Sequence, residues 1–150
     1  MTTYTKILYQ IVFDSKRRIR FFKQSNQDKL FNYLAGISRN KKCYPYKIGG
    51  DTNHIHMLID LHKTQCLSTF VQEVKKASHH WIEENRIIYP DFPGWQIGYS
   101  AFTYDFSSLG TLRKYFENQN EHHRIVNFEE EYKALLKEHG IDYDERYIWE

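Results

Sequence analysis

Several features are scarce or missing in this chain of 150 residues, and each absence excludes a class of protein. No apolar stretch approaches the roughly 20 residues of a membrane-spanning helix, so we expect no contact with a membrane. The opening MTTYTKILYQ lacks the basic and then apolar pattern of a secretion signal, which predicts a cytoplasmic protein. The only two cysteines, Cys43 and Cys66, form no C-x-x-C pair, so we expect free thiols rather than a disulfide framework.

Internal repeats and low-complexity linkers are also missing, while 41% of the residues are hydrophobic and 17% are aromatic. Residues 1–150 therefore form a single predicted domain with a substantial core. The net charge of +2 hides an uneven distribution. Residues 1–50 carry 11 basic and 2 acidic side chains, whereas residues 101–150 carry 6 basic and 11 acidic ones. This asymmetry indicates a polyanion as partner of the first third.

The basic residues are densest in the segment KRRIRFFK, where cations stand beside two phenylalanines. Arg17, Arg18 and Arg20 could neutralise phosphates, and Phe21 and Phe22 could stack on unpaired bases. The alternative is a solvated loop whose phenylalanines belong to the core.

The segment NHIHMLIDL places two histidines one residue apart at the start of an apolar run. In a strand, His54 and His56 share one face, and the residues between and after them form a wholly apolar second face that we expect to pack in the core. The two imidazoles would then converge on one ion. The spacing alone is weak evidence, because such pairs arise by chance in a chain with 8 histidines.

The order of the predicted elements is β-α-β-β-α-β, followed by two further helices. This order predicts an α+β fold of the ferredoxin-like or RRM-like type, an antiparallel sheet with helices on one face and added C-terminal helices. We expect the turn Gly49-Gly50-Asp51 to join the second strand to the histidine strand. The other predictions are strands around residues 7–13, 43–48 and 95–102, a helix after residues 25–28, a helix over about 67–88, a helix from Ser107 or Ser108 to about Arg124, and a last helix from Asn127 to Gly140.

The third predicted helix contains Tyr115 and, four residues later, Gln119, which places both side chains on one helix face. Tyr115 is the only one of the 12 tyrosines with a metal-binding side chain at this spacing. A phenol, with a pKa of about 10, needs an electrophile that a cation has polarised. Mg²⁺ or Mn²⁺ held by neutral imidazole and amide ligands keeps its full charge for that purpose. The alternative is that Tyr115 only packs and Gln119 is solvated.

These motifs together resemble the HUH-superfamily single-tyrosine transposases, small insertion-sequence enzymes that act on single-stranded DNA. The resemblance comprises His54, Ile55 and His56 on a strand and, about 60 residues later, the helical Tyr115-x-x-x-Gln119. It spans nearly the whole chain, with the same length and element order. The sequence departs from the family at Asn53, where an aspartate is common, and this change is expected to weaken support of a ligand.

The resemblance implies a DNA transposase and metal-dependent endonuclease that cleaves and rejoins single-stranded DNA at hairpin-bearing element ends. Tyr115 would be the nucleophile that becomes linked to a 5′ phosphate. His54, His56 and Gln119 would bind the metal, and the resemblance also implies a homodimer with shared active sites. Lys114 is a further candidate for contact with DNA, and His122 and His123 have no assigned role.

Three alternatives stay open at this point. One is a relative of the transposases that serves chromosomal repeats. A non-catalytic binder of single-stranded nucleic acid would explain the basic first third without the motifs. A metal-dependent hydrolase would use the histidines with a water nucleophile. Only the transposase reading requires a covalent adduct between protein and DNA.

Overall fold

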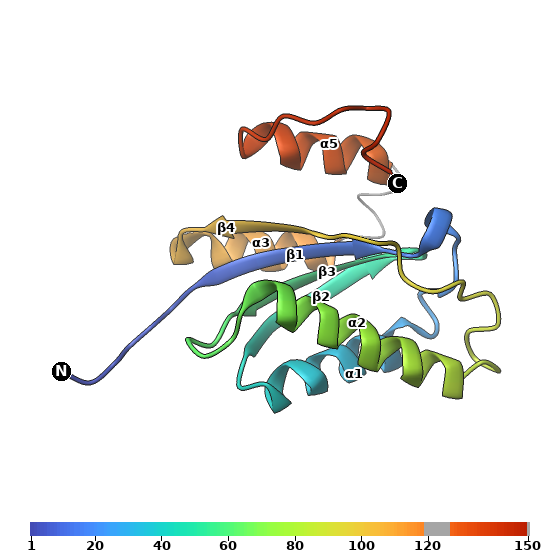
Figure 1. Ribbon diagram of the computed structural model, residues 1–150, viewed down its shortest axis with the longest axis horizontal. Coiled ribbons are helices and arrows are strands. Elements are labelled where there is room, and N and C mark those ends of the chain that lie inside the picture. The colour runs from blue at the N-terminus through green and yellow to red at the C-terminus, as the bar shows by residue number, and fades with distance from the viewer. Residues whose placement is uncertain (119–126, 150) are drawn as a thin grey trace.

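The computed structural model describes residues 1–118 and 127–149 (Figure 1). Its centre is an antiparallel sheet with the strand order β2-β3-β1-β4. The strands are β1 (Leu8–Asp14), β2 (Tyr44–Asp51), β3 (His54–Asp60) and β4 (Ser100–Tyr104). The helices are α1 (Gln27–Asn40), α2 (Leu67–Glu84), α3 (Leu109–Glu117) and α5 (Phe128–Glu138), with short 3-10 turns η1 (Lys16–Arg18) and η2 (Phe106–Ser108). None of the helices in these two ranges is long and apolar enough to cross a bilayer.

Helices α1 and α2 cover one face of the sheet, and α5 lies over the opposite face (Figure 1). The predicted α+β class, with its β-α-β-β-α-β core and added C-terminal helices, is therefore confirmed. Helix α3 packs on the same face as α5, because its Phe116 joins Leu8 and Leu58 in one cluster on that face. The C-terminal helices thus occupy the face that α1 and α2 leave open.

The main core lies between the sheet and helices α1 and α2, as the alternating pattern predicted. Ile55, Met57 and Ile59 of β3 are fully buried there. The apolar stripes of the two helices complete this layer with Leu30, Leu34, Phe70, Val71, Val74 and Ile82. Because strand side chains alternate, the histidines of β3 project from the other face.

Helix α5 begins and ends as predicted from the sequence. The Asn127 side chain accepts a hydrogen bond of 2.9 Å from the Glu130 backbone N–H, which is an N-cap. Gly140 takes a left-handed conformation with φ 66° just after the helix. Helix α3 starts within a residue or two of the predicted position but ends at Glu117, with Asn118 as its C-cap, so the predicted continuation of this helix to about Arg124 is wrong. Residues 119–126 lie outside the described residues.

The predicted turn at Gly49-Gly50-Asp51 is wrong by about two residues. These residues belong to β2, Asp51 pairs with His54, and Thr52 and Asn53 form the turn. Gly50 has φ 148°, and a Cβ there would lie 2.1 Å from the His54 carbonyl oxygen. Glycine is therefore needed at this position because the two strands approach closely there, and not because it forms the turn.

Two other expectations also need correction. Phe21 and Phe22 are only 5% and 2% exposed, because they pack in an aromatic cluster that includes Trp95, so they do not form a stacking surface for bases. The last strand starts at Ser100 instead of Trp95. Trp95 forms an isolated β-bridge with Ser15. Its indole N–H donates a hydrogen bond of 3.0 Å to the Ser78 hydroxyl.

Candidate active site

The two histidines lie side by side on β3, as the strand pattern predicts. Their ring centroids are 5.2 Å apart, and His54 and His56 are only 1% and 0% exposed. Buried polar side chains of this kind need partners. Each ring has one nitrogen fixed by an amide side chain.

Asn53 orients the His54 ring. Its Nδ2 donates to the Arg18 carbonyl oxygen at 3.0 Å, so its Oδ1 is left to accept from His54 Nδ1, 2.8 Å away. This tautomer carries its proton on Nδ1 and its lone pair on Nε2, the form that a metal ligand needs. We expected Asn53 to weaken the support of a ligand, but it supplies the hydrogen bond.

Gln10 orients His56 in the same way. The Gln10 Nε2 donates to the Tyr104 hydroxyl at 2.7 Å, so Gln10 Oε1 accepts from His56 Nδ1 at 2.8 Å. Burial, with a smaller contribution from the charge of Glu138, raises the pKa of Tyr104 to about 12. Tyr104 therefore stays neutral, and the chain of hydrogen bonds leaves the lone pair of His56 on Nε2.

Glu131 of α5 completes a cluster that the sequence analysis missed. Its Oε1 lies 2.9 Å from His56 Nε2 without hydrogen-bond geometry. Ligand atoms of His54, His56 and Glu131 all lie within 4.8 Å of one another, and all three residues are buried. A proton or a metal ion shared between these two atoms would account for the 2.9 Å separation, and two imidazoles with one carboxylate form a donor set that fits a divalent metal.

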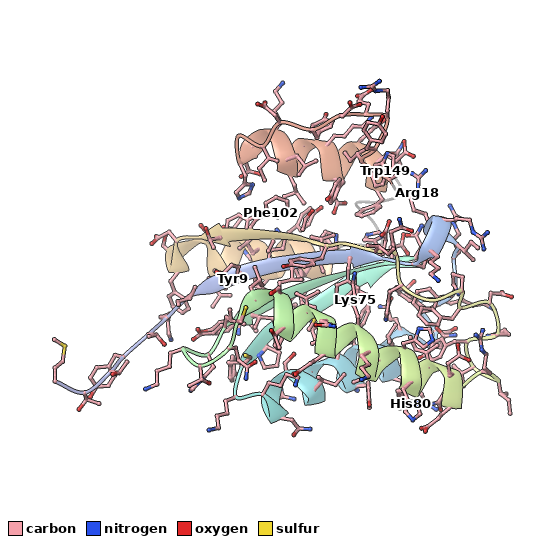
Figure 2. All side chains as sticks on the ribbon, in the orientation of Figure 1. Tyr9, Arg18, Lys75, His80, Phe102 and Trp149 are labelled. Atoms are coloured by element: carbon pink, nitrogen blue, oxygen red, sulfur yellow. The ribbon has the colours of Figure 1, made fainter. Side chains whose placement is uncertain are left out.

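The same helix covers the histidines. The Phe128 ring stacks on His54 with centroids 3.8 Å apart and planes at 11°. Arg18 ties the start of α5 to η1 through an ion pair with Glu129, and its guanidinium lies 4.5 Å from the ring centre of Trp149 (Figure 2). The predicted DNA-binding residue Arg18 is therefore already engaged within the chain.

Tyr115 lies in a groove of about 460 Å³ between α3 and α5. The residues that line the groove include Gln10 and Glu131, whose side chains lie next to the two ring nitrogens of His56. Phe116, the residue after Tyr115, packs against His56 with the two ring centroids 5.5 Å apart. This contact fixes α3 against the histidine face. The structure thus brings the predicted nucleophile and the predicted histidines to one face of the sheet. Gln119, His122 and His123 lie outside the described residues.

The remaining candidates for DNA contact come from η1, the segment after it, and α3. Arg17, Arg20 and Lys114 are exposed. Arg17 and Arg18 both have φ 55°, an uncommon conformation for residues other than glycine. The turn is held by Asn53 and by a backbone bond from Phe21 N–H to the Thr52 carbonyl oxygen. The basic segment is thereby fastened to the hairpin that carries His54.

Gln10 and Glu131 are the two site residues that sequence reasoning missed. Gln10 is a polar residue within an apolar strand, and Glu131 lies near Phe128 and Leu135 on the buried side of a helix. Both break an apolar pattern, which is the signal that could have found them. Their partner, His56, is 46 or more residues away in the chain, so no local spacing identifies the contact.

The site therefore combines a paired-histidine strand with a tyrosine-bearing helix on an antiparallel sheet of the ferredoxin-like strand order. The family model described as "Transposase IS200 like" matches residues 3–119, and the chain belongs to this transposase family. No curated protein matches the chain.

Two solved structures share the fold. A candidate transposase from Deinococcus radiodurans R1 is 20% identical with a TM-score of 0.62, and the match covers 79% of this chain and 95% of that one. A REP-associated tyrosine transposase bound to a REP hairpin is 14% identical with a TM-score of 0.57, and the match covers 82% of this chain and 74% of that one. At these identities the likeness concerns the fold.

Proposed function

We propose that this protein cleaves and rejoins single-stranded DNA at hairpin-bearing ends through a covalent bond between Tyr115 and a 5′ phosphate. One observation carries the proposal. His54 and His56 are buried side by side with their Nδ1 atoms fixed by amides, on the face where Tyr115 lines a groove. Membership of the transposase family supports the reaction class, and the fold neighbour bound to a hairpin supports the type of DNA.

The reaction assigned to Tyr115 conserves the energy of the phosphodiester. The phenol oxygen forms a bond to phosphorus, its proton passes to solvent or a nearby base, and the bond from phosphorus to the 3′ oxygen breaks. The 3′ oxygen leaves and takes up a proton. Attack by a 3′ hydroxyl on the phosphotyrosine reverses these steps, so DNA ends are rejoined without an external energy source.

A divalent cation, Mg²⁺ or Mn²⁺, would polarise the phosphate and stabilise the charge of the transition state. His54 and His56 would hold it through Nε2, because Asn53 and Gln10 accept from Nδ1 and so leave Nε2 with the lone pair in the neutral rings. Glu131 offers a carboxylate oxygen as third ligand in the described arrangement. Gln119, the third ligand expected from the resemblance, remains part of the proposal.

DNA must gain access to this centre before it can react. Because His54 and His56 are at most 1% exposed and Phe128 stacks on His54, we infer that the first turn of α5 moves aside when a phosphate enters. Release of Glu129 from Arg18 would then free this guanidinium for a phosphate. Arg17, Arg20 and Lys114 would add contacts to the DNA backbone.

The proposal includes a homodimer, because two nicks must be coordinated to excise and join an element. In shared sites, the tyrosine of one chain serves the histidines of the other. Mixing a His56→Ala chain with a Tyr115→Phe chain is expected to restore part of the cleavage. Failure to complement in verified heterodimers would assign each site to a single chain.

The decisive experiment follows the covalent bond. Hairpin DNA labelled at either end is incubated with protein and Mg²⁺ or Mn²⁺, then resolved on a denaturing gel. We expect a slow-migrating species that carries only the label on the 3′ side of the cut. Tyr115→Phe should abolish it, whereas the matched control Tyr44→Phe, at an exposed site, should not. Cleavage without an adduct would indicate a hydrolase, and binding without cleavage a single-strand binder.

A repeat-associated relative is the second candidate, since one fold neighbour is REP-associated. Both candidates share the chemistry of Tyr115. Short palindromic ends flanking the gene would favour a mobile element, whereas dispersed hairpins elsewhere in the same genome would favour the repeat-associated role.

A further inference from the structure

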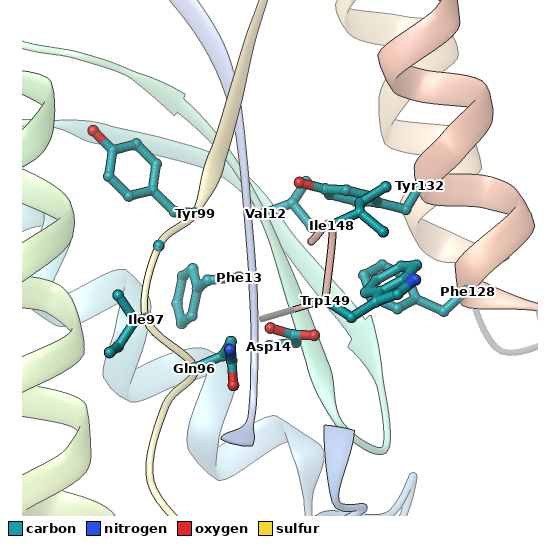
Figure 3. A pocket seen from close by; sticks show the side chains of 11 residues that line it. Val12, Phe13, Asp14, Gln96, Ile97, Tyr99, Phe128, Tyr132, Ile148 and Trp149 are labelled. Atoms are coloured by element: carbon teal, nitrogen blue, oxygen red, sulfur yellow. The ribbon is translucent and has the colours of Figure 1, made fainter. Parts of the chain in front are cut away.

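A small, partly open cavity of about 230 Å³ lies beside Phe128, the residue that stacks on His54, and has no part in the chemistry described so far (Figure 3). It lies between the end of β1, residues 96–99 and the C-terminal elements. Sites for drug-sized ligands occupy about 300–1,000 Å³, so this cavity suits a single planar ring system.

Aromatic side chains form much of the wall of the cavity, and its polar side chains include Asp14 and Gln96. Tyr132 and Trp149 border one side, while the Asp14 carboxylate and the Gln96 amide lie near each other between the walls (Figure 3). Among the described residues, neither the Asp14 carboxylate nor the Gln96 amide bonds to another side chain. Burial raises the pKa of Asp14 to about 6, against the opposing charges of Arg18 and Lys75.

The position of the cavity ties it to the cleavage centre. Asp14 is the direct strand partner of His54, and Phe128 both lines the cavity and stacks on His54. A base in the cavity would therefore belong to a nucleotide close to a phosphate at the histidines.

We propose that this cavity binds one unpaired guanine of the DNA strand and so contributes to the choice of the cleavage position; this inference rests on the proposed function. Guanine presents two donors, N1–H and the N2 amino group, to the two oxygens of Asp14. Its O6 accepts from the Gln96 amide. Stacking on aromatic side chains with hydrogen bonds along the Watson–Crick edge is the usual way in which proteins read unpaired bases.

Other occupants fit less well. An ammonium ligand would suit the aromatic walls and the carboxylate, but the cations of Arg18 and Lys75 already act on Asp14 and would repel it. Cytosine and adenine each offer one amino group to the carboxylate, and thymine offers only its N3–H alongside two carbonyl oxygens. Guanine alone supplies two adjacent donors.

The test measures binding without cleavage. Tyr115→Phe protein in EDTA is titrated with labelled hairpin oligonucleotides whose flanking bases are all thymine except for one guanine, moved one position at a time. We expect one position to tighten binding about 10-fold. Inosine at that position, which lacks the N2 amino group, should lose part of the gain.

The variants decide the assignment. Asp14→Asn should erase the preference for guanine, and Gln96→Ala should reduce it, whereas the matched control Asp91→Asn, an exposed carboxylate outside the cavity, should leave it intact. A uniform response at all positions, a preference for another base, or an unchanged preference in folded Asp14→Asn would overturn the inference. Because nothing is cleaved here, missing adducts in the labelling experiment would overturn the proposed function alone.

Discussion

The two faces of the sheet are built from the same strands but differ in what they bury. On the side of α1 and α2, apolar side chains such as Ile55 and Met57 pack into one continuous layer. On the opposite side, β3 contributes His54 and His56, and the apolar contacts fall into two small clusters under α3 and α5. The difference indicates that stability comes mainly from the first face, and that the second can be partly uncovered without unfolding the domain.

The largest expected effect is the loss of stability on substitution, which should differ between the two faces. Ile55→Ala removes a fully buried side chain from the α1 and α2 face and should lower the free energy of unfolding by about 2–5 kcal/mol. Phe128→Ala on the other face should cost less, since Phe128 is only half-buried. Urea denaturation of both variants measures the two losses. Equal losses would mean that the faces contribute equally to stability.

The next prediction concerns the amides that orient the histidines. Asn53→Ala should lower metal affinity about 10–100-fold, because the His54 tautomer is then no longer fixed. Titration calorimetry with Mn²⁺ measures the change. Asn85→Ala, which removes an amide bonded only near the end of α2, is the control. Unchanged affinity in Asn53→Ala would remove Asn53 from the site.

Asp14 offers a prediction on pH. Its pKa is raised from 3.8 to about 6 in the folded protein, so between these values the folded state holds more protons than the unfolded one. Its contribution therefore makes stability fall as pH rises through this window. Asp14→Asn should stabilise the protein by about 1–2 kcal/mol at pH 7.5 and have little effect at pH 3.5. A gain of the same size at both pH values would contradict this cause.

The smallest effect concerns the exposed cations. Replacing Arg17 and Arg20 with Ala should flatten the slope of log affinity for hairpin DNA against log salt by about 2 units, one for each lost phosphate contact. Arg39→Ala with Lys42→Ala, at the far end of α1, is the matched control for charge. If both double variants change the slope equally, the contacts are not specific to the basic segment.

Local patterns predicted the elements of this fold, because the signals lie within a few residues. The alternation in β3 placed His54 and His56 on one face, and Asn127 marked the start of α5. The contacts of Gln10 and Glu131 with His56 depend on how distant elements pack, which no spacing along the chain reports. Phe21 beside arginines looked like a base-stacking residue, but burial against Trp95 decided its role.

Gly50 has a consequence for the length of the hairpin. Its contact with the His54 backbone leaves no space for a Cβ and fixes the pairing of Asp51 with His54. If the strands slipped by one residue, Ile55 and Met57 would turn towards α5 and the histidines would enter the apolar layer. An insertion or deletion in this hairpin would thus exchange the two faces without changing a single ligand. The number of residues between β2 and β3 is therefore as important to the position of this site as the identity of the histidines.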